Sequence, residues 1–172
     1  DEQQTNFQEL FRNCFVSTAD TTTKLLENGE TYVFTGDIEA MWLRDSSAQV
    51  VHYFPFAKKV ESIRAMISGL IQRQMRYITI DPYANAFNEE ENGHCWEKDD
   101  TDSNDWEWER KYEIDSLCYP IWLLHRYYET TKDEHIFSAQ VKIAFRRILD
   151  TWSTEQHHDE ASSYYFRRTN CP

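Results

Sequence analysis

The sequence is poor in glycine and proline, with four of each among 172 residues. Average proteins contain about 7% glycine, so a glycine-rich phosphate loop, a collagen repeat and a flexible linker are all unexpected. Basic residues are also few, since 18 Lys and Arg stand against 30 Asp and Glu and leave a net charge of −12. This negative surplus repels nucleic-acid phosphates and anionic lipid surfaces, so we expect no nucleic acid and no membrane as partners.

Long apolar runs and paired cysteines are missing too. No apolar stretch reaches the length of a membrane-spanning helix, and no basic-then-apolar leader opens the chain. The four cysteines form no CxxC pair, which favours free or buried thiols over a disulfide or a metal site. The six histidines show no zinc spacing, and P-loop and GxSxG motifs are absent. We therefore expect no metal and no cofactor.

Helical periodicity is the dominant pattern of the chain. Apolar residues recur at i, i+3 and i+4, which is typical of amphipathic helices. The helices predicted from this pattern are 7–15, 20–27, 41–58, 63–78, 116–130 and 137–152. Only 31–35 is typical of a strand, with 164–166 as a weaker candidate. Pro82 is expected to end the helix before it, and Pro120 to kink the helix that contains it.

One segment, 89–115, differs in composition from the rest. It holds twelve acidic and three basic residues, together with three tryptophans. Long loops in compact domains are usually functional or disordered, and the tryptophans argue against disorder. Within it, residues 100–104 match the first ligand positions of a calcium loop. Asp105 and Lys111 replace the required Gly and Glu, so an EF-hand is not expected, although a looser calcium site stays open.

Three groups of polar residues are candidates for chemistry. On a helix, Trp42, Asp45, Gln49, His52 and Tyr53 fall on one face, which is odd for a core or a solvent face and suits a pocket for a hydroxylated ligand. The alternative is that Arg44 and Asp45 only pair at a helix end. A second such face combines Lys111, Asp115, Cys118, Trp122 and His125.

Carboxylates also gather at the start of that second helix. Glu109, Glu113 and Asp115 lie beside aromatic residues, an environment that raises the pKa of an acid. The alternative is a solvated helix start, where acids are favoured by the macrodipole. The third group is Asn85 and Asn88, in a turn that could bind sugar hydroxyls, although asparagine is common in turns for backbone reasons alone.

Three sequence blocks resemble the signature blocks of glycoside hydrolase family 125. They are TGDIEAMWLRDSSAQV (35–50), DPYANAFN (81–88) and WERKYEIDSLCYPIWLL (108–124). The family contains exo-α-1,6-mannosidases. The resemblance implies a mainly α fold, the (α/α)6 toroid, with an inverting mechanism that removes terminal α-1,6-linked mannose from N-glycan-type oligosaccharides. The chain would cover about half of the toroid, with one short strand or hairpin.

The resemblance also implies a division of the site. An inverting glycosidase needs two carboxyls about 6.5–9.5 Å apart, and the family blocks that carry them, including an SGFRPSDD-like stretch, do not occur before Pro172. Residues 1–172 are then expected to be the N-terminal part of a single catalytic domain, inactive alone, prone to aggregation, and completed by the missing C-terminal part. Asp37 is expected to hold the strand-to-helix turn. The residues expected to line the mannose site are Trp42, Arg44, Asp45, Asn85, Asn88, Lys111, Glu113 and Asp115.

Two other functions stay open from the sequence. One is an (α/α)6 glycosidase with a different sugar specificity, since pocket shape decides which epimer fits. The other is a non-catalytic sugar- or calcium-binding domain that uses the acidic, tryptophan-rich loop. The chain begins without Met, which leaves export open, and a secreted or periplasmic location is slightly favoured over a cytoplasmic one.

Overall fold

The centre of the fold is one long helix, α4 (Glu61–Ile80). The computed structural model describes residues 2–169, with side chains from residue 4 onward. The fully buried apolar stripe of α4 consists of Ile67, Leu70, Ile71, Met75 and Ile78. Full burial of such a side chain stabilises the fold by about 1.5–3 kcal/mol. Packed against α4 are α5 (Ile114–Thr131), α6 (Ala139–Glu155) and β2 (Thr31–Val33).

The three long helices of this core were predicted from periodicity and are confirmed. α4 ends at Ile80, directly before Asp81-Pro82, as the proline predicted. α6 begins after Ser138, whose hydroxyl accepts a hydrogen bond from the Val141 amide at 3.3 Å. Pro120 lies inside α5, and the kink there stays a prediction. η2 (Glu134–Ile136) connects α5 to α6.

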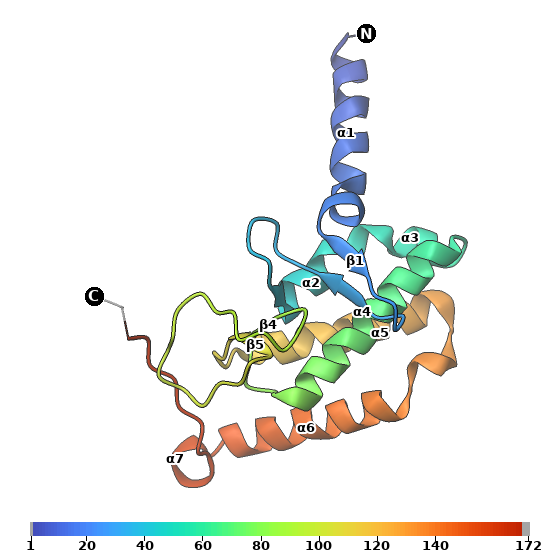
Figure 1. Cartoon of the computed structure of the whole chain (residues 1–172). Helices are drawn as coiled ribbons and strands as arrows, with labels where there is room; N and C mark the ends of the chain where they lie inside the picture. The colour runs from blue at the N-terminus through green and yellow to red at the C-terminus, as the bar shows by residue number, and fades with distance from the viewer. Residues whose placement is uncertain (1, 170–172) are drawn as a thin grey trace.

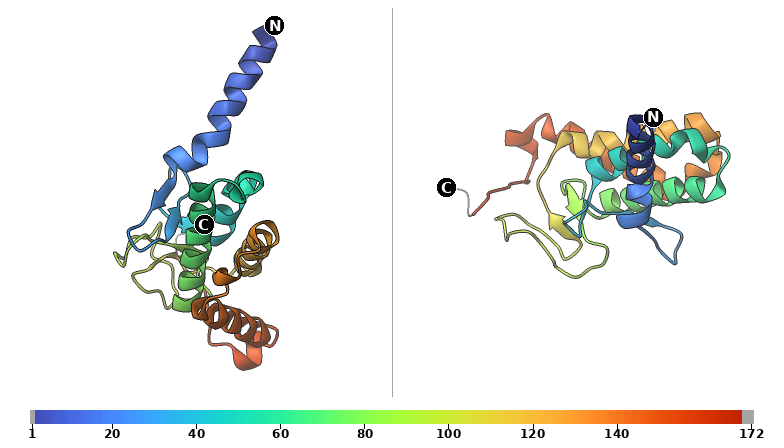
Figure 2. Two further views of the ribbon diagram at one scale, coloured as in Figure 1. Left: turned by 90° about the vertical axis from the view of Figure 1, so that its right-hand side faces the viewer. Right: turned by 90° about the horizontal axis from the view of Figure 1, so that it is seen from above.

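The first helix, α1 (Glu2–Thr21), extends away from the body of the molecule (Figures 1 and 2). Its predicted apolar stripe is helical but not buried, since Phe7 is 66% and Phe11 is 60% exposed. The short helix predicted for 20–27 is wrong. Those residues form the end of α1 and then β1 (Thr23–Leu25), which pairs with β2 in an antiparallel hairpin. The β-branched run of threonines favours a strand there, and Gly29 supplies the positive φ of the turn.

The single helix predicted for 41–58 is also wrong. This stretch contains β3 (Met41–Trp42), α2 (Leu43–Gln49), η1 (Val51–Tyr53) and α3 (Phe54–Ala57). Pro55 lies in the first turn of α3, where a missing amide hydrogen costs no hydrogen bond. In one continuous helix the same proline would interrupt the backbone hydrogen bonds, so a new helix begins there instead.

A second, three-stranded sheet was not predicted. It has the order β3-β4-β5, where β4 is Ala86–Phe87 and β5 is Glu107–Glu109, and both pairings are antiparallel. Ala86 pairs with Glu109 and Phe87 with Glu107, so the residue between the two glutamates has no ladder partner. Strands of two or three residues are too short to show alternation in the sequence. The sheet joins the three sequence blocks that resemble the family.

The chain end closes over the acidic loop that leads to β5. After α7 (His158–Ala161), Tyr164 stacks on Tyr83 with ring centroids 4.7 Å apart, and its hydroxyl accepts from the Tyr112 amide at 2.8 Å. The weaker strand candidate at 164–166 is not a strand, although Arg167 forms an isolated bridge with Asp100. Within residues 2–169, no helix is long and apolar enough to cross a membrane, and Cys14, Cys95 and Cys118 are free thiols.

Candidate functional site

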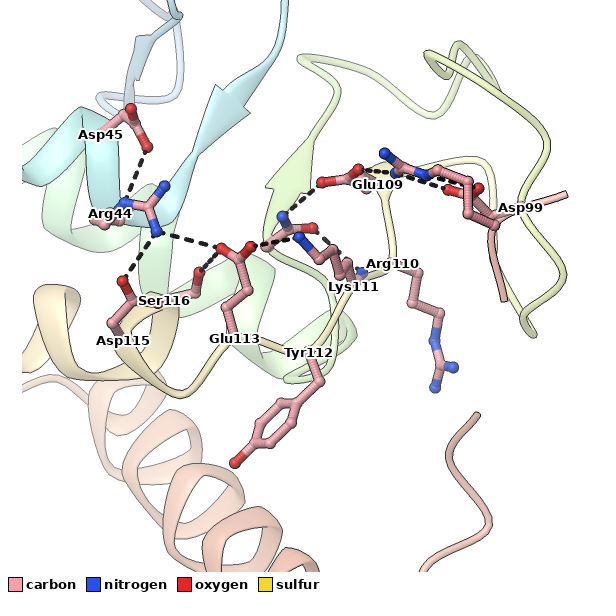
Figure 3. A network of polar contacts seen from close by, with 12 residues as sticks. Arg44, Asp45, Asp99, Glu109, Arg110, Lys111, Tyr112, Glu113, Asp115 and Ser116 are labelled. Atoms are coloured by element: carbon pink, nitrogen blue, oxygen red, sulfur yellow. Dashed lines mark hydrogen bonds and ion pairs between the residues drawn. The ribbon is translucent and has the colours of Figure 1, made fainter. Parts of the chain in front are cut away.

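Arg44, in the first turn of α2, lies at the centre of a network of polar contacts (Figure 3). Its Nη1 donates to Asp115 Oδ2 at 2.9 Å and to Glu113 Oε2 at 3.4 Å, and its Nε lies 3.6 Å from Asp45 Oδ2. The hydrogen bond to Asp115 and the charges of all three carboxylates raise the pKa of Arg44. Lys111 adds a second cation, 3.1 Å from Glu113 Oε1. Two cations against three carboxylates leave this group with an excess of acceptors.

Asn85 joins the two segments that supply this network. Its Nδ2 donates to Glu109 Oε2 at 2.7 Å, and its Oδ1 accepts from the Lys111 amide at 3.3 Å. Its carbonyl accepts from the Leu43 amide at 3.1 Å, at the start of α2. The side chain is buried, so these bonds hold the entrance to α2 against the segment between β5 and α5. Asn85 therefore links, through its hydrogen bonds, the two elements that position Arg44 and Glu113.

Asn88 lies apart from this network. It is buried, and its Nδ2 donates to the carbonyls of His94 at 2.9 Å and Asp105 at 3.2 Å. Its amide donates to the Trp106 carbonyl, and its own carbonyl accepts from the Tyr77 hydroxyl. These bonds organise the acidic loop, so a place for Asn88 in the mannose site stays a prediction.

Trp42 is the last residue before α2 and has an extended backbone. It pairs with Ala86, which in turn pairs with Glu109. Directly opposed residues share one face of a sheet, so half-buried Trp42 lies on the face that carries Glu109. Asp37 lies in the exposed turn before β3, where the Ile38 amide donates to the Thr35 carbonyl at 3.3 Å.

The single polar face predicted for 42–53 is corrected by the break after Gln49. His52 Nε2 and the Tyr53 hydroxyl both contact the carbonyl of Phe15, at 2.9 and 2.8 Å. These two residues therefore anchor α1 rather than join Asp45. Only Asp45 and Gln49 of that set lie in α2.

Asp45 and Gln49 each carry a buried oxygen that lacks a hydrogen-bond partner within the described residues. The atoms are Asp45 Oδ2, which has only its ion-pair distance to Arg44, and Gln49 Oε1. Buried polar atoms without a partner are rare in folded proteins. Such acceptors, next to the Arg44 network, suit a ligand that carries hydroxyl donors.

The second predicted face is correct only in part. Lys111 precedes α5 and therefore cannot lie on its helical face, whereas Asp115 lies in the first turn of α5. Trp122 is exposed on α5, and desolvation raises the pKa of the Cys118 thiol. Asp115 thus contacts Arg44 from the start of the helix without an aromatic neighbour from that set.

A raised carboxyl pKa was predicted for Glu109, Glu113 and Asp115. The carboxyl with a raised pKa is instead that of Glu107, which the sequence did not single out. Burial, and next the charge of Asp81, raise the pKa of Glu107 to about 8. Arg110 Nε donates to Asp81 Oδ2 at 2.6 Å and stabilises this cluster. The alternation of Trp and Glu at 106–109 is typical of a strand, but it gives no signal for the burial of Glu107, which is 3% exposed.

The acidic loop was also a candidate for a calcium site. Within residues 2–169, no group of three or more His, Cys, Asp or Glu side chains is arranged to hold a metal ion. Asp102 instead accepts from the Tyr165 hydroxyl at 3.1 Å, and the Asp100 backbone bridges to Arg167. Both contacts fasten the acidic loop to the chain end.

Comparison with known proteins identifies the family of the chain. Residues 4–172 match the family model described as metal-independent alpha-mannosidase, GH125. The chain is 33% identical over 175 residues to the meiotically up-regulated gene 157 protein of Schizosaccharomyces pombe, covering 95% of this chain and 33% of that protein.

A solved structure from Streptococcus pneumoniae matches with a TM-score of 0.91 and 44% identity, over 99% of this chain and 41% of that one. It is described as a metal-independent alpha mannosidase in a non-productive complex with α-1,6-mannobiose. The chain thus spans less than half the length of these relatives and corresponds to the N-terminal portion of an (α/α)6 toroid. It belongs to glycoside hydrolase family 125, the metal-independent α-mannosidases.

Proposed function

We propose that this chain supplies part of the sugar pocket of a glycoside hydrolase that releases terminal, non-reducing α-1,6-linked mannose with inversion. The observation that carries the proposal is the TM-score of 0.91 to a mannosidase solved with α-1,6-mannobiose. The residues proposed to contact mannose are those that converge around Arg44. They are Arg44, Asp45, Lys111, Glu113 and Asp115, with Trp42 beside them.

The chemistry of this group suits the binding of hydroxyls. Carboxylates accept hydrogen bonds from hydroxyl groups, while guanidinium and ammonium groups donate to hydroxyl oxygens. Asp45 Oδ2 is a buried acceptor that no donor within residues 2–169 satisfies by a hydrogen bond. A mannose hydroxyl would fill that role, and the Trp42 ring would offer an apolar surface to the C–H groups of the sugar.

The same group suits binding better than proton transfer. Inversion needs one carboxylic acid to protonate the leaving oxygen and one carboxylate to activate a water, about 6.5–9.5 Å apart. Here Glu113 and Asp115 both accept from Arg44, so they are engaged as acceptors. The acid–base pair is therefore assigned to the part of the protein beyond Pro172, and residues 1–172 to one part of a single catalytic domain.

Exposed apolar residues support this division of the domain. They lie on three helices and would be covered by the C-terminal part: Phe7, Leu10 and Phe11 on α1, Ile114 and Trp122 on α5, and Ile143 and Leu149 on α6. The three on α1 follow the i, i+3, i+4 spacing of one helix face, and exposed apolar patches of this kind are uncommon on isolated monomers and mark interfaces.

The experiment compares the Asp45→Asn variant with the unchanged protein. Both proteins are extended beyond residue 172 to the full length of the family. Release of mannose from α-1,6-mannobiose is measured beside the α-1,2- and α-1,3-linked isomers and an α-1,6-linked glucose disaccharide. We expect activity on the first substrate alone and its loss in the variant. Preference for another disaccharide would favour a different glycosidase specificity. Binding without hydrolysis would favour a non-catalytic sugar-binding domain.

A further inference from the structure

A pocket of about 560 Å³ lies outside the Arg44 network. One wall is the turn before β3, and the other is the acidic loop before β5. Asp37 and Glu39 line it from the first wall, and Trp96 and Trp108 line it from the second. None of these side chains belongs to the group proposed above to contact mannose.

Trp108 reaches this pocket because the sheet is irregular at its position. It lies between Glu107 and Glu109, which both pair with β4, so it is the extra residue of a register shift. Such bulges bend a strand and redirect a side chain, and they are common near binding sites. The indole Nε1–H of Trp108 is buried and has no hydrogen-bond partner within residues 2–169. This donor is therefore not used by any described acceptor of the fold.

The remaining lining groups match the chemistry of a sugar. Trp96 is 64% exposed, so its ring face is free to stack on a ligand. The carboxylates of Asp37 and Glu39 make no hydrogen bond or ion pair with any described residue. Two indole rings with two free carboxylates provide apolar faces for C–H groups and acceptors for hydroxyls. The acidic lining disfavours phosphate or sulfate groups, which leaves neutral, hydroxylated ligands as the matching class.

The sheet sets the distance between this pocket and the Arg44 network. β3 and β5 are both antiparallel to β4, so they run in the same direction. Asp37 and Glu39 precede β3. Arg44 follows β3 and Glu113 follows β5, so both lie at the opposite end of these strands. A strand of three residues spans about 10 Å. The strands thus separate Asp37 and Glu39 from Arg44 by about the length of one or two sugar units, a spacing that suits a ligand of several units.

We propose that this pocket is a second carbohydrate subsite, which binds another unit of the mannose oligosaccharide whose terminal unit lies at Arg44. The assignment rests on the proposed function. It makes the preferred substrate an oligosaccharide longer than a disaccharide. Trp96 and Trp108 supply the stacking surfaces, and Asp37 and Glu39 accept from the hydroxyls of this second unit.

The test compares a short and a long substrate in the protein extended through the full length of its family. Trp96→Ala removes one stacking surface, and Glu91→Ala is the control, a substitution at an exposed position of the same loop that does not line the pocket. We expect Trp96→Ala to raise KM for a branched mannose oligosaccharide about tenfold. It should leave α-1,6-mannobiose kinetics unchanged, and Glu91→Ala should change neither.

A spectroscopic measurement keeps the test independent of turnover. In 5-fluorotryptophan-labelled protein, the branched oligosaccharide should shift the ¹⁹F resonances of Trp96 and Trp108 and leave that of Trp122 in place. Equal KM values for Trp96→Ala and the unchanged protein, or unshifted resonances in a protein that cleaves mannobiose, would overturn the subsite alone. No cleavage and no binding of either sugar would overturn the proposed function, and the subsite with it.

Discussion

Arg44 donates to Asp115 at 2.9 Å, across 71 residues of sequence, and so links the first turn of α2 to the first turn of α5. Both side chains are more than a third exposed. Exposed ion pairs contribute about 0–1 kcal/mol to stability, because water screens them. The pair therefore does little to hold the fold and is available to a ligand.

This relationship predicts a separation of binding from stability in Arg44→Lys. An ammonium group is a point charge and cannot reproduce the planar contacts of Arg44 with Asp115, Glu113 and Asp45. We expect mannose binding by the full-length protein to fall at least about tenfold, a loss of 1.4 kcal/mol, measured by calorimetry. The free energy of unfolding in urea should change by less than about 1 kcal/mol.

Arg64→Lys is the control for that experiment. Arg64 is as exposed as Arg44 and pairs with Glu61 on the surface of α4. It should leave both binding and stability unchanged. Strong destabilisation by Arg44→Lys with unchanged binding would mean that the Arg44 network is structural.

Asn88→Ala should destabilise the acidic loop. The substitution removes the Nδ2 donor from the carbonyls of His94 and Asp105, of which the second keeps the Gly93 amide, at a cost of about 1–3 kcal/mol. Hydrogen exchange of amides in 89–106 should accelerate, and urea unfolding should report the loss. Asn92→Ala, on an exposed asparagine of the same loop, should have a smaller effect. Equal effects of the two variants would show that burial of Asn88 is unimportant.

The raised pKa of Glu107 predicts that the free energy of unfolding falls as pH rises. Its folded pKa of about 8 lies above the ordinary value of 4.5, because burial and then Asp81 disfavour the charged carboxylate. The contribution of the protonated group is therefore fully present below pH 4.5 and is lost as pH rises to about 8. Glu107→Gln keeps a neutral side chain at every pH, so it should flatten this part of the profile in urea unfolding. A profile with the same slope in the variant would assign the pH dependence to other groups.

The exposed apolar face of α1 predicts self-association of residues 1–172. Phe11 lies on this face and is 60% exposed. Phe11→Lys should lower the apparent mass measured by light scattering after gel filtration. Asn13→Lys adds the same charge at another exposed position of α1 and should leave the mass unchanged. A monomeric, cooperatively folding unchanged chain would contradict the proposal that this face is covered by the C-terminal part.

The elements predicted correctly from sequence are those with enough turns to show a period. α4, α5 and α6 each carry a long apolar stripe. The break between Trp42 and Pro55 was missed because its helical pieces are short and share one apolar pattern. The β3-β4-β5 sheet was missed because its pairing depends on contacts between residues far apart in sequence.

The candidate site was predictable to a similar extent. The residues around Arg44 converge because α2 and α5 begin side by side, and their place in the mannose site stays a prediction. The two asparagines of one turn could not be distinguished from sequence. Asn85 meets Glu109, whereas Asn88 meets the carbonyls of the loop that folds back over it. Glu107 was missed because its burial is set by tertiary packing against Asp81, 26 residues earlier.

The most direct test of the central proposal is the release of free mannose from α-1,6-mannobiose by two proteins, residues 1–172 and the protein extended through the full length of the family. NMR follows the anomer of the mannose as it forms. We predict that the longer protein alone releases mannose, first as the β anomer, because inversion of an α linkage gives that product. Release at a comparable rate by residues 1–172 would contradict the division of the site, and release of the α anomer would contradict inversion.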